Sequence, residues 1–377
     1  MPWSVPPLGL SLRAARTRLL CGEFGSTIER LLGEALATGC ELSWLDIPPA
    51  RDDIATGSSN WPLSPAFAGS LHIGPLDAAT ADLWKWLGAA IRTARADDRF
   101  VATAALAPVT SGDLRIAFPL EFVQHRIEQV LVASALEVIP CVQLQVSPEH
   151  HRNDHHWSEL RETMLRLVRE GKVLHWGVAV AAPPRVVPVD RNRDPDDDSP
   201  PSDDFPDLAR DDAMSSLAVP YHLFGQNPVR WFATAAQLKL AVITTEPLCS
   251  GALAGEIGAS TLFHRFDPRA ARWTPADLQR MAVSVARLAQ CVKQVPLAAN
   301  SCEDARAVVG QWQQARTNKQ ATEPGVTSLL ELALRFVLST TPGVTVVGAC
   351  TSAQWLAAHL AADPRPLDAA LLASLVQ

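Results

Sequence analysis

The 377-residue chain lacks the features that mark a membrane or secreted protein. No apolar run approaches the roughly 18 residues that a membrane-spanning helix needs. The N-terminal stretch lacks a basic start, a long apolar region and a small-residue cleavage site, so we expect no secretory signal. The seven cysteines are scattered and contain no CxxC pair. This pattern indicates reduced thiols in a cytoplasmic protein rather than a disulfide framework or a structural zinc site.

Basic charge is scarce and acidic charge is concentrated. The formal net charge is −7, and the stretch from Asp190 to Asp212 contains ten Asp against three Arg, which accounts for the whole imbalance. The remaining chain is close to neutral and has no basic stripe. Nucleic-acid binding is therefore not expected.

Two segments have the composition of loop insertions. Residues 182–213 are rich in Pro and Asp and hold few large apolar side chains. They cannot bury enough surface to order themselves, which predicts a disordered acidic insertion, either a solvated loop or a lid over a site. Residues 50–80 are punctuated by Gly, Pro and Ser and predict a second loop insertion.

Short apolar runs alternate with helical segments between these loops. The runs have the length and composition of buried parallel strands, which helices cover on both faces. They are LSWLDI (42–47), FVATAAL (100–106), VIPCVQLQV (138–146), HWGVAVA (175–181), LAVPYHL (217–223), LAVITTEPL (240–248) and VTVVGAC (344–350).

The segments between the runs show helical spacing and end signals. Leu160, Met164 and Leu167 fall on one helical face, and Gly171 is a plausible stop. Thr274 is placed as the N-cap of a second helix, with Pro275 at its first position. Strand–helix repetition over more than 300 residues predicts that residues 1–377 form one closed (β/α)₈ TIM barrel with catalytic loops at the carboxyl ends of its strands.

Four stretches in order along the chain resemble the aldo-keto reductases over nearly its whole length. They are EALATGCELSWLDIPPA, LRETMLRLVREGKVLHWGVAV, VITTEPLCSGALAG and LALRFVLSTTPGVTVVGACTSAQWLAAHL. The resemblance implies a barrel of that family, which reduces carbonyls with NADPH. The family uses a Tyr as general acid, tuned by a Lys and a His, with an Asp that supports the Lys.

The catalytic roles of that family are mostly missing at the matching positions. The Asp role falls on Asp46, whereas the Tyr role falls on Arg51. The Lys role falls on Ala104 or Ala105, and the His role on Gln145. The general acid must donate a proton, and a neighbouring cation must lower its pKa for that. The resemblance therefore implies that three of the four roles are gone.

The cofactor contacts implied by the resemblance are also replaced by small or apolar residues. The nicotinamide contacts fall on Ala179, Val180, Ala218 and Thr245, and those of the adenosine end fall on Cys350 and on Ala358 or His359. Gly348 and Thr351 remain as vestigial matches. Each lost polar contact costs about 1–3 kcal/mol of cofactor affinity, so no bound cofactor is expected.

A histidine-rich loop, EHHRNDHHW, follows Gln145 directly and would begin at the rim of the barrel. Imidazole and carboxylate groups suit zinc or iron, but adjacent side chains diverge and the spacing matches no metal motif such as HExxH. Three interpretations stay open: a metal site, a general acid or base, and a polar rim loop. The metal interpretation would use His150, His151, Asp154, His155 and His156, and the acid–base interpretation would use His155 or His156.

Three charged residues are expected near the pocket mouth from different strand ends: Asp46, Arg51 and Glu246. A carboxylate that faces an arginine can bind an anionic substrate or orient an acid–base group. The alternative is a plain salt bridge between Asp46 and Arg51. Tyr221, the chain's one tyrosine, is either a pocket hydroxyl or a buried side chain with one hydrogen bond.

The sequence thus predicts an aldo-keto-reductase-like barrel that has left nicotinamide redox chemistry. We expect a small-molecule enzyme of non-redox acid–base type, performing elimination, isomerisation or cyclisation in a biosynthetic pathway. Arg51 would bind an anionic group of the substrate. Proton transfer and hydrogen bonds would come from Asp46, Gln145, His155, His156 and Glu246. The alternatives are a silent pseudoenzyme that binds a partner and an NADPH reductase with replacement catalytic groups. The Ala, Arg and Pro content suggests a bacterial origin.

Overall fold

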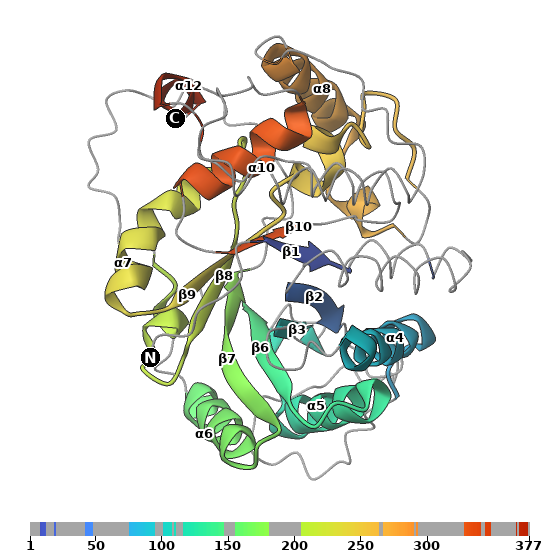
Figure 1. The fold of residues 1–377 in the computed structure, drawn as a ribbon, viewed down its shortest axis with the longest axis vertical. Coiled ribbons are helices and arrows are strands. Elements are labelled where there is room, and N and C mark those ends of the chain that lie inside the picture. Colours follow the sequence, from blue (N-terminus) through green and yellow to red (C-terminus); the bar gives the residue numbers. More distant parts are fainter. Residues whose placement is uncertain are drawn as a thin grey trace.

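Eight parallel strands form a closed barrel in the order β1-β10-β9-β8-β7-β6-β3-β2 (Figure 1). The computed structural model describes residues 8–12, 19, 42–47, 75–94, 101–107, 109–110, 116–146, 155–180, 205–263, 267–289, 292, 328–340, 344–347, 367 and 369–375. The strands are β1 (Leu8–Ser11), β2 (Leu42–Ile47), β3 (Val101–Leu106), β6 (Ile139–Val146), β7 (Val173–Val180), β8 (Ser216–Pro220), β9 (Ala241–Thr245) and β10 (Val344–Val347). The predicted barrel is confirmed.

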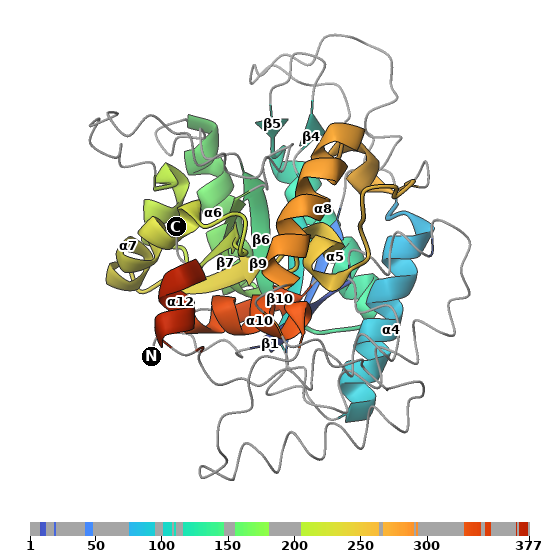
Figure 2. The same ribbon diagram turned by 90° about the horizontal axis from the view of Figure 1, so that it is seen from above.

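Helices surround the barrel (Figures 1 and 2). They are α4 (Ala78–Ala94), α5 (Leu120–Ser134), α6 (His155–Arg169), α7 (Phe232–Gln237), α8 (Pro275–Ala289), α10 (Leu329–Thr340) and α12 (Ala369–Leu375). Four 3₁₀ segments lie between them: η1 (Asp207–Arg210), η2 (Asn227–Trp231), η3 (Cys249–Ala254) and η4 (Pro268–Ala271). Strands β4 (Val109–Thr110) and β5 (Ile116–Ala117) form a separate antiparallel pair. In the described part of the chain, every helix is too short or too polar to cross a bilayer.

The helix ends follow the predicted signals. Helix α8 starts after Thr274, whose Oγ1 accepts a hydrogen bond from the Asp277 N–H at 3.2 Å, while Asp277 Oδ2 accepts from the Thr274 N–H at 3.0 Å. These two hydrogen bonds satisfy two backbone N–H groups at the start of the helix that have no partner within the first helical turn. After α6, Gly171 adopts a φ of 72°, which a glycine tolerates without steric cost.

Alternate residues of the strands build two separate apolar cores. In β3, Ala104 packs in the large cluster between the strands and the helices, together with Trp84 and Phe122. Its neighbour Ala105 belongs to a second cluster. Successive strand residues face opposite sides, so this second cluster fills the inside of the barrel. Its members are Val101, Ala105, Cys141, Ala179, Ala218 and Ile243.

The prediction of disorder for residues 182–213 is wrong for the last part of that segment. Phe205 and Leu208 are buried, and residues 207–210 form η1. Asp211 accepts hydrogen bonds from Arg161 Nε at 2.9 Å, Trp157 Nε1 at 3.1 Å and the Ala213 N–H at 2.9 Å. The prediction from composition failed here because two large apolar side chains are buried and because one aspartate accepts hydrogen bonds from three donors. Residues 182–204 and 50–74 lie outside the described residues.

Replacing Asp211 by Asn is expected to lower the free energy of unfolding by about 1.5–3 kcal/mol, because a charged acceptor with several donors is lost. Burial raises the pKa of the Asp211 carboxyl, but the bonds from Ala213, Arg161 and Trp157 outweigh it and hold that pKa below its ordinary value. The stabilisation is therefore complete above about pH 4 and is lost as the pH falls through the lowered pKa. Urea unfolding from pH 2 to 7 measures both effects. Asp212→Asn is the matched control, since the Asp212 side chain is 92% exposed. An equal loss in both variants would contradict the anchoring role.

Candidate active site

The predicted site residues that the structure describes lie at or beyond the carboxyl ends of the barrel strands. Asp46 is the second-last residue of β2 and pairs in register with Ala105. Gln145 is half-buried near the end of β6 and pairs with Ala179. Glu246 follows β9 directly, and His155 and His156 are the first two residues of α6.

Other predicted positions lie outside the described residues, namely Arg51, His150, His151, Asp154, Gly348 and Thr351. The proposed contact between Asp46 and Arg51 and the histidine-loop metal site therefore stay predictions. Among the residues that are described, no group of three or more His, Cys, Asp or Glu is placed to hold a metal ion.

Small apolar side chains stand at the strand ends where the family resemblance places polar catalytic and cofactor-binding groups. Ala105, Ala179 and Ala218 belong to the inner cluster and are at most 5% exposed. Ala105, rather than Ala104, is the inward-facing residue near the end of β3. Val180, at the end of β7, packs with the outer core. The inner wall of the barrel is thus apolar near the carboxyl ends of these three strands.

A carboxylate–guanidinium pair occupies the end of β9. Arg272 Nη1 donates to Oε1 and Oε2 of Glu246, both at 2.8 Å, and to Ser250 Oγ at 2.9 Å. The side chains of Glu246 and Arg272 are 11% and 18% exposed. Both oxygens of Glu246 are thus engaged, which fixes the guanidinium in one orientation.

The backbone around this pair adopts an uncommon conformation. Glu246, Cys249 and Ser250 have φ values of 57°, 51° and 56°, in the left-handed region that non-glycine residues rarely adopt. Such residues cost on the order of 1–3 kcal/mol each and cluster at functional sites. Three of them within five positions indicate that surrounding contacts hold this turn in shape.

A second ion-pair group lies beneath the turn. Arg269 binds Asp267 through Nη2 at 2.8 Å and Glu256 through Nη1 at 3.0 Å, and Nη1 also donates to the Ser250 carbonyl at 3.3 Å. Burial lowers the pKa of Arg269, but Asp267 and Glu256 outweigh that effect and raise it. This group supports the backbone of the residue whose hydroxyl contacts Arg272.

A buried histidine stands on the neighbouring strand end. The Tyr221 N–H donates to the Thr245 carbonyl at 3.0 Å, so His222 and Glu246 each follow the last paired residue of β8 and β9. His222 is 6% exposed. Burial lowers its pKa to about 4, opposed by the charge of Glu246 and assisted by that of Arg272. The imidazole is therefore neutral near pH 7.

Tyr221 has a structural role rather than a pocket role. Its ring stacks on Phe336 with centroids 5.6 Å apart and meets Phe232 edge-on at 5.2 Å. Burial raises the pKa of its hydroxyl, and a hydrogen bond with Thr340 partly opposes this. The buried interpretation of the sequence is thus supported, because the ring points into the core toward α7 and α10.

Sequence reasoning placed Glu246 at the rim but missed Arg272 and His222. Arg272 lies 26 positions further along the chain, in a turn without periodic apolar residues, and no local pattern ties it to Glu246. His222 was included within an apolar strand. Strand β8 ends at Pro220, so His222 lies two residues beyond the strand, and Pro220 was the feature of the sequence that could have indicated this strand end.

Comparisons with known proteins identify the fold. No protein-family model and no curated protein match the chain. Among solved structures, the glycerol dehydrogenase from Gluconobacter oxydans is 14% identical with a TM-score of 0.59, covering 100% of this chain and 93% of that chain. An aldo-keto reductase from Bacillus halodurans in its holo form is 13% identical with a TM-score of 0.53, covering 98% and 92%. One from Klebsiella pneumoniae in complex with NADPH is 18% identical with a TM-score of 0.51, covering 98% and 90%.

One of these neighbours was solved with NADPH, and three of the four positions that the resemblance assigns to the nicotinamide of that cofactor lack a polar side chain here. Ala179, Val180 and Ala218 offer no side-chain donor or acceptor, whereas Thr245 keeps a hydroxyl. Ala105 stands where the resemblance places the catalytic Lys. The pair formed by Glu246 and Arg272 supplies charge on a different strand end. The near-complete coverage by these three structures and the closed parallel barrel lead to one conclusion: the chain has the fold of the aldo-keto reductases.

Proposed function

We propose that this protein is a non-redox small-molecule enzyme that performs acid–base chemistry, such as elimination, isomerisation or cyclisation, at the carboxyl end of its barrel. The observation that supports it is the apolar inner wall at Ala105, Ala179 and Ala218, where hydride transfer in this fold would need polar groups. Polar and charged groups gather instead at the ends of β8 and β9. A fold does not fix a function, so a barrel with this replacement is free to host other chemistry.

The proposed roles rest on the contacts of Glu246 and on the places of the other residues along the chain. Glu246 has both oxygens bound by Arg272, so its role is to hold that guanidinium. Asp46 and Gln145, near the ends of β2 and β6, are proposed for proton transfer and hydrogen bonding to the substrate. His155 and His156 at the start of α6 and Arg51 keep the roles predicted from the sequence, with Arg51 binding any anionic substrate group.

We expect no binding of NADPH or NADP⁺ up to millimolar concentration, because three of the four positions that would hold the nicotinamide are the apolar residues Ala179, Val180 and Ala218. Calorimetry and quenching of the eleven tryptophans measure this directly. A Kd tighter than about 10 µM, roughly 7 kcal/mol of binding free energy, would overturn the proposal and favour an atypical NADPH reductase. That alternative has the support of the NADPH-bound neighbour.

A second measurement separates an enzyme from a silent binding protein. Incubating the protein with a panel of ketones, keto acids and hydroxy acids in D₂O detects proton abstraction as deuterium incorporation in the NMR spectrum. An active acid–base site exchanges at least one compound, and Asp46→Asn reduces that exchange about 100-fold or more if Asp46 is the base. No exchange with any compound would favour the pseudoenzyme.

A further inference from the structure

The last described helix, α12, is held to the barrel near both of its ends. Just before it, the N–H of Leu367 donates to Ser339 Oγ of α10 at 2.7 Å. At its far end, the Leu375 carbonyl accepts a hydrogen bond from Gln226 Nε2, also at 2.7 Å. Leu367 and Leu375 are buried, whereas the described residues between them are partly buried or exposed. Helix α12, red in Figures 1 and 2, thus lies beside α10 and depends on these end contacts more than on packing along its length.

Gln226 connects the end of α12 to the turn that follows β8. Its side-chain amide carries two N–H groups. One donates to the Leu375 carbonyl at 2.7 Å and the other to the Leu223 carbonyl at 3.0 Å. Gln226 is buried, and a buried polar group that loses its partner is costly. A single nitrogen therefore ties α12 to this turn.

The turn is short and closes over His222. The Gly225 N–H donates to the His222 carbonyl at 2.8 Å, and the His222 N–H donates to the Gly225 carbonyl at 3.4 Å. The Phe224 N–H donates to Nδ1 of His222 at 3.2 Å, so the proton of the neutral ring is on Nε2. An added Cβ on Gly225 would lie 2.8 Å from Cε1 of the ring. The backbone of the turn thus covers the imidazole, and Leu223, whose carbonyl Gln226 binds, lies within the turn.

We propose that α12 is a strap that holds the rim turn, residues 221–226, closed over His222 through Gln226. Gln226 is the positioning residue. When α12 is released, the rim turn opens and His222 becomes accessible at the end of β8. A segment with few buried side chains opens at a lower free energy than the barrel strands, so this release does not require the barrel to unfold. The bearing of the strap on catalysis rests on the proposed function, whereas the strap itself does not.

Gln226→Met tests the strap, because methionine has a similar length and cannot donate a hydrogen bond. We expect the backbone amides of Phe224 and Gly225 to exchange with solvent about tenfold faster than in the wild type. Burial lowers the pKa of His222 to about 4, opposed by Glu246 and assisted by Arg272. Opening the turn removes the burial, so NMR titration of the variant should show that pKa raised toward its ordinary value.

Two changes in α12 complete the test. Leu375→Ser removes a buried apolar side chain from the end of the helix and leaves Gln226 in place, and it should produce the same two effects. Ser374→Ala is the matched control, because the Ser374 hydroxyl donates to the Leu371 carbonyl within the helix at 2.6 Å. This variant should change neither the exchange rates nor the titration.

Unchanged exchange of the rim turn in both Gln226→Met and Leu375→Ser would overturn the strap. So would an equal acceleration at Val142 in β6, which would indicate weakening of the whole barrel. If neither variant folds, the wild type decides. The amides of the last turn of α12 and of the rim turn should then show protection within about tenfold of each other, because they open as one unit, and a larger difference would overturn the strap.

The strap and the proposed function fail separately. Deuterium incorporation into a test compound, together with an unchanged rim turn in both variants, would remove the strap and leave the function. Faster exchange of the rim turn in both variants, without incorporation into any compound, would leave the strap and remove the function.

Discussion

Replacing Arg272 by Met is expected to lower the free energy of unfolding by about 3–5 kcal/mol. The substitution removes the guanidinium that pairs with Glu246 at 2.8 Å, and the Glu246 carboxylate, whose side chain is 11% exposed, loses that charge. Removing one member of a buried ion pair costs this much because the remaining charge stays desolvated. Part of the cost also comes from the strained turn at Ser250, whose hydroxyl loses its contact with Nη1. Denaturant unfolding at pH 7 measures the change.

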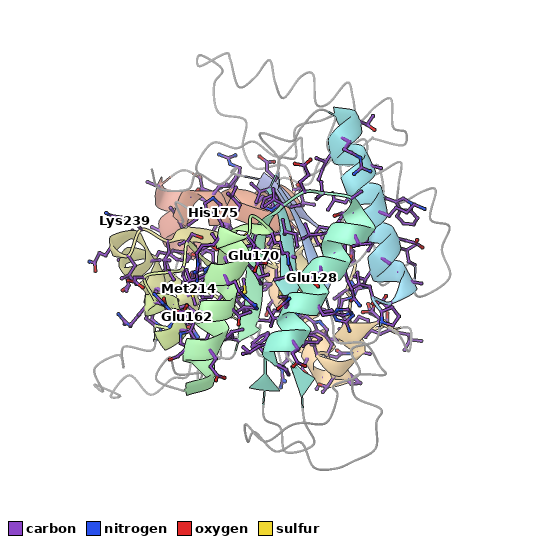
Figure 3. All side chains as sticks on the ribbon, turned by 90° about the horizontal axis from the view of Figure 1, so that it is seen from below. Glu128, Glu162, Glu170, His175, Met214 and Lys239 are labelled. Atoms are coloured by element: carbon purple, nitrogen blue, oxygen red, sulfur yellow. The ribbon has the colours of Figure 1, made fainter. Side chains whose placement is uncertain are left out.

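Lys172 provides the matched control for Arg272. It binds Glu128 Oε1 at 2.9 Å and Glu170 Oε2 at 3.1 Å, but these carboxylates are 40% exposed on α5 and after α6 (Figure 3). Lys172→Met should cost no more than about 1 kcal/mol, because water screens an exposed pair. The double variant Glu246→Gln/Arg272→Met should recover most of the lost stability, since no unpaired charge remains. A loss below about 1 kcal/mol in Arg272→Met would show that the pair is not needed to hold the turn.

Gly177→Ala is expected to cost about 3 kcal/mol or more, because strands β7 and β8 approach too closely to admit a methyl group. An added Cβ would lie 2.0 Å from the Ser216 carbonyl oxygen and 2.5 Å from Ser216 Oγ. The backbone would have to move apart, and the Ser216 hydroxyl would lose its 2.6 Å bond from Gln143 Nε2 inside the barrel. Overpacking a buried site usually costs 1–3 kcal/mol, and here the obstacle is backbone rather than a flexible side chain.

Gly258→Ala is the control for this prediction. An added Cβ there meets nothing within 4 Å, so the change in stability should stay within about 0.5 kcal/mol. Thermal unfolding of both variants by circular dichroism gives the comparison. Gly177→Ala could fail to accumulate as folded protein, and Gly177→Ser is then made as a second variant. If Gly177→Ser also fails to accumulate while Gly258→Ala accumulates normally, the steric argument is supported. Equal stability of the two alanine variants would contradict it.

The barrel could be predicted from the sequence because its strands are apolar on both faces. LSWLDI matches β2 at both ends, and the runs at 100–106 and 138–146 each differ from β3 and β6 by one residue. Strand β1 was missed, since Leu8–Ser11 is four residues long and contains a glycine. Such a strand owes its conformation to pairing with β2 and β10 rather than to its own residues.

The site was less predictable, because its contacts join residues that only the fold brings together. Glu246 could be placed from the strand that precedes it, but its partner Arg272 lies in a turn beyond η4. The tautomer of His222 depends on a single backbone N–H two residues later. The composition of the segment also could not indicate the hydrogen bonds of Asp211. Its donors Trp157 and Arg161 lie on α6, about fifty positions earlier in the chain.

The pairing of the first and last barrel strands has a consequence for synthesis on the ribosome. Gly9 of β1 lies opposite Val346 of β10, so one edge of β1 stays without its partner until almost the whole chain has been made. At 5–20 residues per second, that interval is roughly 20–70 s. During it, the open edges of β1 and of the growing sheet can pair with other chains. We therefore expect the yield of folded protein to depend on chaperones that bind nascent chains, more strongly than on the stability of the finished barrel.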